Sequence, residues 1–141
     1  MYQTGELLKF SPFTFKNGNL PKPKYFIVLG VMDEKVMMAV LPTSKDHVPA
    51  DATVERGCVS IAERGVNAYV FSPNDQVTPT FSFFKPTFVY GEQVDEYEYS
   101  YLDAMTGSVE HLGIIEPIIF QELKDCIKKA SQLRRKYRML L

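Results

Sequence analysis

Apolar residues alternate with polar ones, or run together, in short stretches of the chain that are separated by turn-forming residues. The stretch "GELLKFSPF" would place Leu8 and Phe10 on one face of an extended chain, and it predicts a first strand over 5–11 that Pro12 interrupts. The runs "KYFIVLGV" and "KVMMAVL" are rich in aliphatic residues and are separated by the short connection "MDE". They predict an antiparallel hairpin of two strands that are buried on both faces.

Further short stretches with strand character follow, and the period then changes near the end of the chain. The later strand candidates are "GCVSI", "VNAYVFS", "PTFVYG" and "VEHLGII". From Pro117 onward, apolar residues recur at steps of three and four, which predicts a helix over about 117–138. The predicted fold is mainly β with a C-terminal helix (α+β), a small barrel of five to six strands.

The composition is that of one folded domain over residues 1–141. Of these residues 45% are hydrophobic, and a net charge of -1 gives no overall field that would attract nucleic acid. Charge is nevertheless uneven, with carboxylates concentrated in 91–103 and basic residues in 128–138. The acidic stretch fits either a half-exposed strand or a surface for a basic partner. The basic end complements the helix dipole and could also contact RNA phosphates.

The cysteines and histidines give no metal-binding pattern. Cys58 and Cys126 lie far apart and next to apolar residues, which favours buried free thiols over a disulfide. A zinc site built from these cysteines with His47 and His111 would lack the usual ligand spacing, and His111 is expected to pack or to cap. We therefore expect no metal and no other cofactor.

The N-terminus and the hydropathy of the chain indicate the compartment. The start "MYQTGELLKF" has no basic stretch followed by a long apolar run, and the longest apolar stretch, around "YFIVLGVM", is too short to span a membrane. A cytoplasmic protein without membrane contact is the expectation.

The stretch "LPTSKDHVP" interrupts the apolar pattern and is either a polar turn or a site. Thr43 and Ser44 commonly satisfy backbone groups where a strand ends, but their hydroxyls can also bind phosphate oxygens. In the predicted hairpin, the outer ends at Lys24 and Thr43 lie next to each other. A lysine there would supply a positive charge from a fixed backbone position.

The order of four landmarks resembles that of the MazF/PemK (CcdB-like) toxin family. These landmarks are "GELLKF", "PKYFIVLG", "LPTSK" and "HLGIIEPIIFQELKDCIKKA". A lysine that opens the second strand and a Thr-Ser-Lys loop are similar to the ToxN-like branch, whose toxins are controlled by small RNAs. The resemblance implies an SH3-like, MazF-like barrel that forms a homodimer.

The resemblance also implies an activity, a metal-independent endoribonuclease that cleaves single-stranded RNA and is held in check by an antitoxin, either protein or RNA. Lys24, Thr43 and Ser44 are then the expected catalytic residues. Lys22, Lys45 and His47 are the expected substrate-binding residues, and His47 is also a candidate base because an imidazole titrates near neutrality. The alternative is a non-catalytic barrel that binds a protein or RNA partner.

Overall fold

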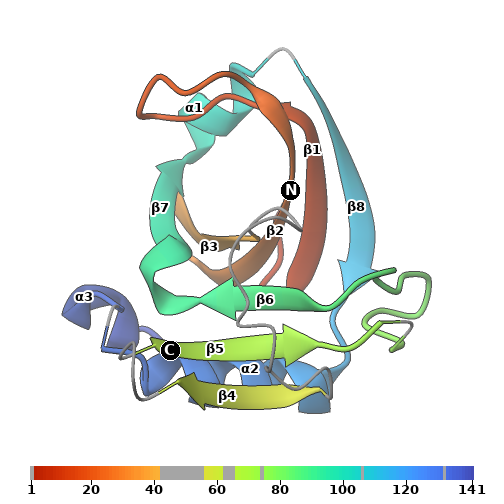
Figure 1. The fold of residues 1–141 in the computed structure, drawn as a ribbon. Helices are drawn as coiled ribbons and strands as arrows, with labels where there is room; N and C mark the ends of the chain where they lie inside the picture. Colours follow the sequence, from red (N-terminus) through yellow and green to blue (C-terminus); the bar gives the residue numbers. More distant parts are fainter. Residues whose placement is uncertain (1, 42–55, 62–65, 74, 106, 132) are drawn as a thin grey trace.

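The protein is described by a computed structural model that covers residues 2–41, 56–61, 66–73, 75–105, 107–131 and 133–141. Within these ranges the strands form two antiparallel sheets (Figure 1). The larger sheet has the order β7-β3-β2-β1-β8, and the smaller sheet has the order β4-β5-β6. The strands are β1 (Glu6–Phe13), β2 (Lys22–Val31), β3 (Lys35–Val40), β4 (Gly57–Ile61), β5 (Val66–Phe71), β6 (Thr87–Tyr90), β7 (Val94–Glu98) and β8 (Ser108–Ile114).

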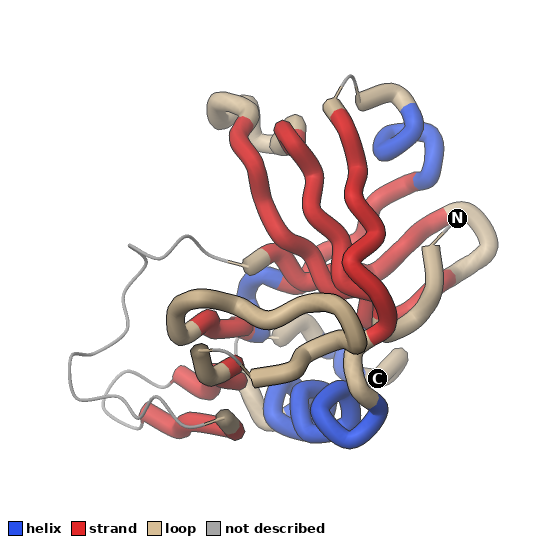
Figure 2. The backbone as a smooth tube through the Cα atoms, turned by 90° about the vertical axis from the view of Figure 1, so that its right-hand side faces the viewer, coloured by secondary structure: helices blue, strands red, loops and turns tan. Residues whose placement is uncertain are grey.

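Short helical turns connect β6 to β7 and β7 to β8, and a longer helix follows the last strand. Helix α2 packs against β4 and β5, and its buried residues share one apolar cluster with strands of both sheets (Figures 1 and 2). The helical elements are the 3-10 turn η2 (Gly91–Gln93), α1 (Tyr99–Asp103), α2 (Pro117–Lys128) and α3 (Arg135–Arg138).

The hairpin predicted from the two aliphatic runs is confirmed as β2 and β3, which pair antiparallel with Phe26 opposite Val40. Both strands are buried on both faces, as predicted. Alternate side chains enter two separate apolar clusters, for example Ile27 in one and Phe26 in the other. The first cluster holds α2 and the smaller sheet against the larger sheet, and the second is an aromatic cluster closed by α1.

Strand β1 continues past the predicted interruption at Pro12 and ends at Phe13. The pairing with β2 shifts register between Phe10 and Phe13, so an irregularity accommodates a residue that has no N–H to donate. Gly107 makes this possible, because a Cβ there would lie 2.5 Å from the Pro12 carbonyl oxygen. Sequence pattern alone did not show that a distant glycine leaves room for the proline.

The predicted strands are present, but they are divided between two sheets. The order of the larger sheet leaves β7 and β8 as its two edges. The acidic stretch contributes β7, and Tyr97 on this strand is buried in the aromatic cluster while Glu98 is exposed. This agrees with the interpretation of a half-exposed strand, although the stretch continues from residue 99 as the short helix α1.

The predicted helix over 117–138 is wrong in length, because α2 ends at Lys128 and a separate turn, α3, begins at Arg135. Between them the chain packs closely on Gly91, where a Cβ would lie 2.9 Å from the Ala130 Cβ. The Arg138 guanidinium donates to the carbonyls of Lys128, Ala130 and Leu133 and so satisfies groups that a continuous helix would have satisfied. The apolar residues that follow α2, Ala130, Leu133 and Tyr137, are therefore buried although no continuous helix carries them.

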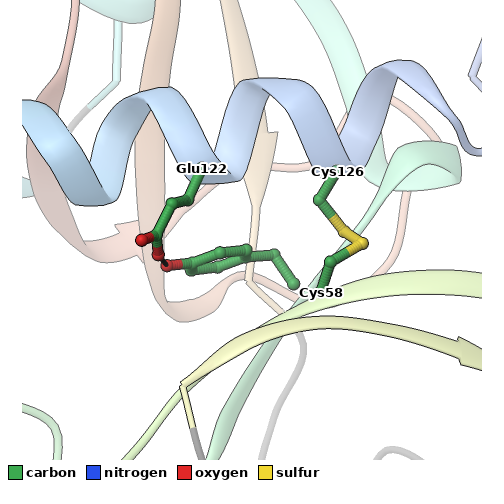
Figure 3. The surroundings of a disulfide bond; sticks show 4 residues. Cys58, Glu122 and Cys126 are labelled. Carbon is green, nitrogen blue, oxygen red and sulfur yellow. Dashed lines mark hydrogen bonds between the residues drawn. A yellow bond between two sulfur atoms is a disulfide. The ribbon is translucent and has the colours of Figure 1, made fainter.

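The expectation of free thiols is also wrong, since Cys58 on β4 and Cys126 on α2 form a disulfide (Figure 3). The two residues are 68 positions apart in the sequence. They meet because α2 lies across β4, a packing of distant segments that cysteine spacing does not reveal. Both sulfur atoms are thereby removed from any zinc site of the kind considered above.

None of the helices in the described ranges is long and apolar enough to cross a membrane.

Candidate functional site

A polar cavity of about 440 Å³ opens where β2 begins and β3 ends. The loop between β1 and β2 forms one wall, η2 and β7 form another, and Arg134 lies on the segment that leads to α3. Its lining includes the basic residues Lys16, Lys22, Lys24 and Arg134 and the acidic residues Glu92 and Asp95. The cavity lining therefore carries charges of both signs, with more basic than acidic side chains.

Lys22 and Lys24 reach this cavity from the same strand. Residues two apart in a strand point to the same side, so both lysines share the face of β2 that carries Phe26. Lys24 is only 8% exposed, and its ammonium donates to the carbonyl of Leu41 at 3.4 Å. A lysine so buried at the edge of a cavity can present its charge to a bound anion under weak solvent screening.

The predicted meeting of the outer ends of β2 and β3 is observed as far as Leu41. The Leu41 N–H donates to the Tyr25 carbonyl at 2.9 Å, which continues the hairpin one residue past the end of β3. The remaining predicted site residues lie outside the described residues: Thr43, Ser44, Lys45 and His47. Of the predicted catalytic and substrate-binding set, the structure thus places Lys22 and Lys24, and it brings them to one cavity.

Asp95 on β7 links its strand to the loop between β1 and β2 and to α3. Its carboxylate lies 3.3 Å from the Lys16 ammonium, accepts a hydrogen bond of 3.1 Å from the Tyr137 hydroxyl, and accepts another of 2.8 Å from the Glu96 N–H. The Lys16 ammonium also lies 4.2 Å from the centre of the Tyr97 ring. These contacts hold the loop between β1 and β2, and α3, against the same strand.

The electrostatics of this network follow from burial and from the hydrogen bonds. Burial raises the pKa of Asp95, but the Glu96 N–H, the Lys16 charge and the Tyr137 hydroxyl outweigh it, so the pKa lies below the ordinary 3.8. For Tyr137, burial comes first and the negative charge of Asp95 second, and together they raise its pKa to about 12. At neutral pH the carboxylate is charged and the phenol is neutral, which is the pairing that the hydrogen bond requires.

Replacing Asp95 by asparagine is expected to lower the free energy of unfolding by about 0.5 to 1 kcal/mol at neutral pH, a small value because Lys16 and Asp95 are both partly exposed. A group with a depressed pKa contributes stability above its ordinary pKa and loses it as the pH falls through the depressed value. The difference between variant and parent, measured by urea unfolding, should therefore shrink below about pH 4.

Glu98→Gln is the control for this prediction, since Glu98 is exposed on the same strand. It should change stability little at any pH. A difference for Asp95→Asn that is as large at pH 3 as at pH 7 would contradict the assigned network.

Several residues of the cavity were not predicted from the sequence, among them Lys16, Asp95 and Tyr97. The loop between β1 and β2 is long enough to have suggested a role, and Arg134 lies in the basic segment that could contact phosphates. Nothing in the local pattern indicated that these two segments meet on β7.

The other histidine considered above, His111, is exposed on β8 and is not among the residues that line the cavity. Its Nδ1 is 2.7 Å from a carboxylate oxygen of Glu6, and its ring lies near that of Tyr2. Within the part of the chain that the structure describes, no three His, Cys, Asp or Glu residues are placed to hold a metal ion.

In comparisons with known proteins, no family model and no curated protein sequence matches this chain.

Proposed function

We propose that the protein is a metal-independent endoribonuclease of the MazF/PemK type that cleaves single-stranded RNA. One observation carries the proposal, namely that Lys22 and Lys24 line one polar cavity at the end of the hairpin from which the chain continues to Thr43 and Ser44. The same cavity includes aromatic rings and amides, which suit the stacking and hydrogen bonding of unpaired bases.

The proposed chemistry is an attack of the ribose 2′-oxygen on the adjacent phosphate. This step requires a base for the 2′-hydroxyl, positive charge for the pentacoordinate phosphate, and an acid for the leaving 5′-oxygen. Lys24 is the proposed source of positive charge, and the hydroxyls of Thr43 and Ser44 are proposed to bind phosphate oxygens. Lys22, Lys45 and His47 are proposed to contact the substrate, with His47 as the candidate base.

The proposal is tested by incubating the purified protein with labelled single-stranded RNA in the presence of EDTA. We expect cleavage with products that carry a 2′,3′-cyclic phosphate, and no dependence on chelators, because the proposed charges come from lysine rather than from a metal. Cleavage that disappears in EDTA and returns with added magnesium or zinc would contradict the proposal.

A specific observation supports the alternative, a binding module without catalysis. Asp95 and Glu92 bring negative charge into the cavity, and Lys16 is already paired with Asp95, which weakens the positive field that a phosphate would feel. RNA binding by the parent protein without any cleavage would favour this function over the nuclease.

We further propose a two-fold symmetric homodimer that is regulated by an antitoxin, either protein or RNA. The apolar face of α2 is buried within the chain's own core, but Met139 and Leu140 beyond α3 are 77% and 55% exposed and could be covered by a second copy. Light scattering at micromolar concentration should give twice the mass of 16.1 kDa. A monomeric mass would contradict the proposed homodimer but would not bear on the proposed nuclease activity.

A further inference from the structure

The disulfide joins two elements that differ in their exposure to solvent. Cys58 lies on β4, the edge strand of the smaller sheet, and is exposed. Its partner Cys126 lies on α2 (Figure 3). It is 1% exposed and belongs to the apolar cluster that contains Leu123 and Ile127. A thiol reagent from solvent can therefore reach the sulfur of Cys58 more readily than that of Cys126.

In the described residues, β4 is held on α2 by the disulfide and by a surface ion pair. Its described side chains are exposed or half-buried, and Arg56 before the strand forms an ion pair of 3.3 Å with Glu122 in which both side chains are well exposed. Such exposed pairs contribute little. The neighbouring strand β5 is different, because Tyr69 is fully buried and its hydroxyl donates to Glu122 at 2.7 Å.

We propose that the Cys58–Cys126 disulfide is a redox-modification site, reduced by a dithiol that attacks Cys58. A thiolate of the dithiol forms a bond with the Cys58 sulfur while the bond between Cys58 and Cys126 breaks, and Cys126 leaves as a thiolate that takes a proton from solvent. The second thiolate of the dithiol then attacks the mixed disulfide and releases Cys58. The protein gains two electrons, and the dithiol leaves as its own disulfide.

The structural consequence is local. Reduction removes the covalent link between β4 and α2 but leaves the ladder between β4 and β5 and the buried contacts of β5 intact. Edge strands with few buried side chains open at low free energy. The reduced protein should therefore stay folded while β4 becomes more mobile.

This inference also bears on the expected compartment. Disulfides persist in oxidising compartments, and those of cytosolic proteins are usually transient and redox-active. A cytoplasmic location, as the sequence predicts, therefore requires a disulfide that cellular dithiols can open, and the exposure of Cys58 meets that requirement. The inference does not depend on the proposed nuclease activity.

The site of attack is tested with a thioredoxin-type protein whose second active-site cysteine is replaced by serine, so that a mixed disulfide accumulates. The native chain is incubated with this probe, quenched with N-ethylmaleimide, and digested for mass spectrometry. We expect the probe on Cys58 and maleimide on Cys126. The proposal is overturned if the probe is found on Cys126, or if no adduct forms without denaturant.

The local effect is tested by amide hydrogen exchange before and after treatment with dithiothreitol. Amides of β4 should exchange at least about tenfold faster in the reduced protein, while those of β2 and β3 stay protected and exchange more slowly than those of β4. The variant with both Cys58→Ser and Cys126→Ser is the matched control. In this variant the β4 amides should exchange fast without dithiothreitol, and adding dithiothreitol should not change their rates. Equal β4 exchange in both redox states, or loss of protection throughout the chain, would overturn the proposal.

Discussion

Replacing Lys24 by methionine is expected to lower the rate of RNA cleavage by about a hundredfold or more. The substitution keeps most of the aliphatic stem that fills the base of the cavity but removes a charge from a largely desolvated site. Loss of one charged stabilising group from a transition state of this kind costs about 2 to 4 kcal/mol. The rate is measured with labelled RNA under single-turnover conditions, alongside the melting temperature.

Methionine is preferred to alanine because Lys24 is buried. Alanine would remove packing as well as charge, so its effect on the rate could not be assigned to the charge alone. Lys85→Met is the matched control, since Lys85 is exposed on the loop before β6 and outside the set of residues that line the cavity. It should leave cleavage unchanged. If Lys24→Met cleaves RNA as fast as the parent, Lys24 has a structural role, and its contact with the Leu41 carbonyl is sufficient to explain its burial.

Removing the disulfide by the combined changes Cys58→Ala and Cys126→Ala is expected to lower the free energy of unfolding by about 4 kcal/mol. The cross-link closes a loop of 68 residues, and the entropy that it removes from the unfolded chain corresponds to about that value. The melting temperature should fall by about 10 °C. Because small domains are stable by about 5 to 15 kcal/mol, the variant should still fold at 25 °C.

Urea unfolding of the oxidised parent, the reduced parent and the double variant separates this effect from a loss of packing. The reduced parent and the double variant should have similar midpoints, both well below that of the oxidised parent. Equal midpoints for the oxidised and the reduced parent would show that the disulfide does not constrain the unfolded chain as supposed.

The strands could be predicted from the sequence because their signals are local. The uninterrupted apolar runs "FIVL" and "VMMA" predict strands that are buried on both faces. The structure shows this burial as two apolar clusters on opposite faces of the larger sheet. The start of α2 at Pro117 and its buried residues follow from a period of three and four. In each case the residues that carry the signal are neighbours in the chain.

The candidate site was predictable in part for the same reason. Lys22 and Lys24 lie two residues apart on one strand, so their common direction follows from the alternation of side chains. The hairpin then places them beside the end of β3, because the connection at its other end is short. The cavity also needs Asp95 and Arg134, which come from segments about 70 and 110 residues further along the chain.

By itself, then, the sequence determined which segments are strands and where the long helix starts. Only the tertiary structure decided the division into two sheets, the end of α2 at Lys128, the network around Asp95 and the Cys58–Cys126 disulfide. The physical reason is that these features depend on contacts between residues distant in sequence. Local hydrophobic periodicity shows that a residue will be buried, but not which distant residue it will meet.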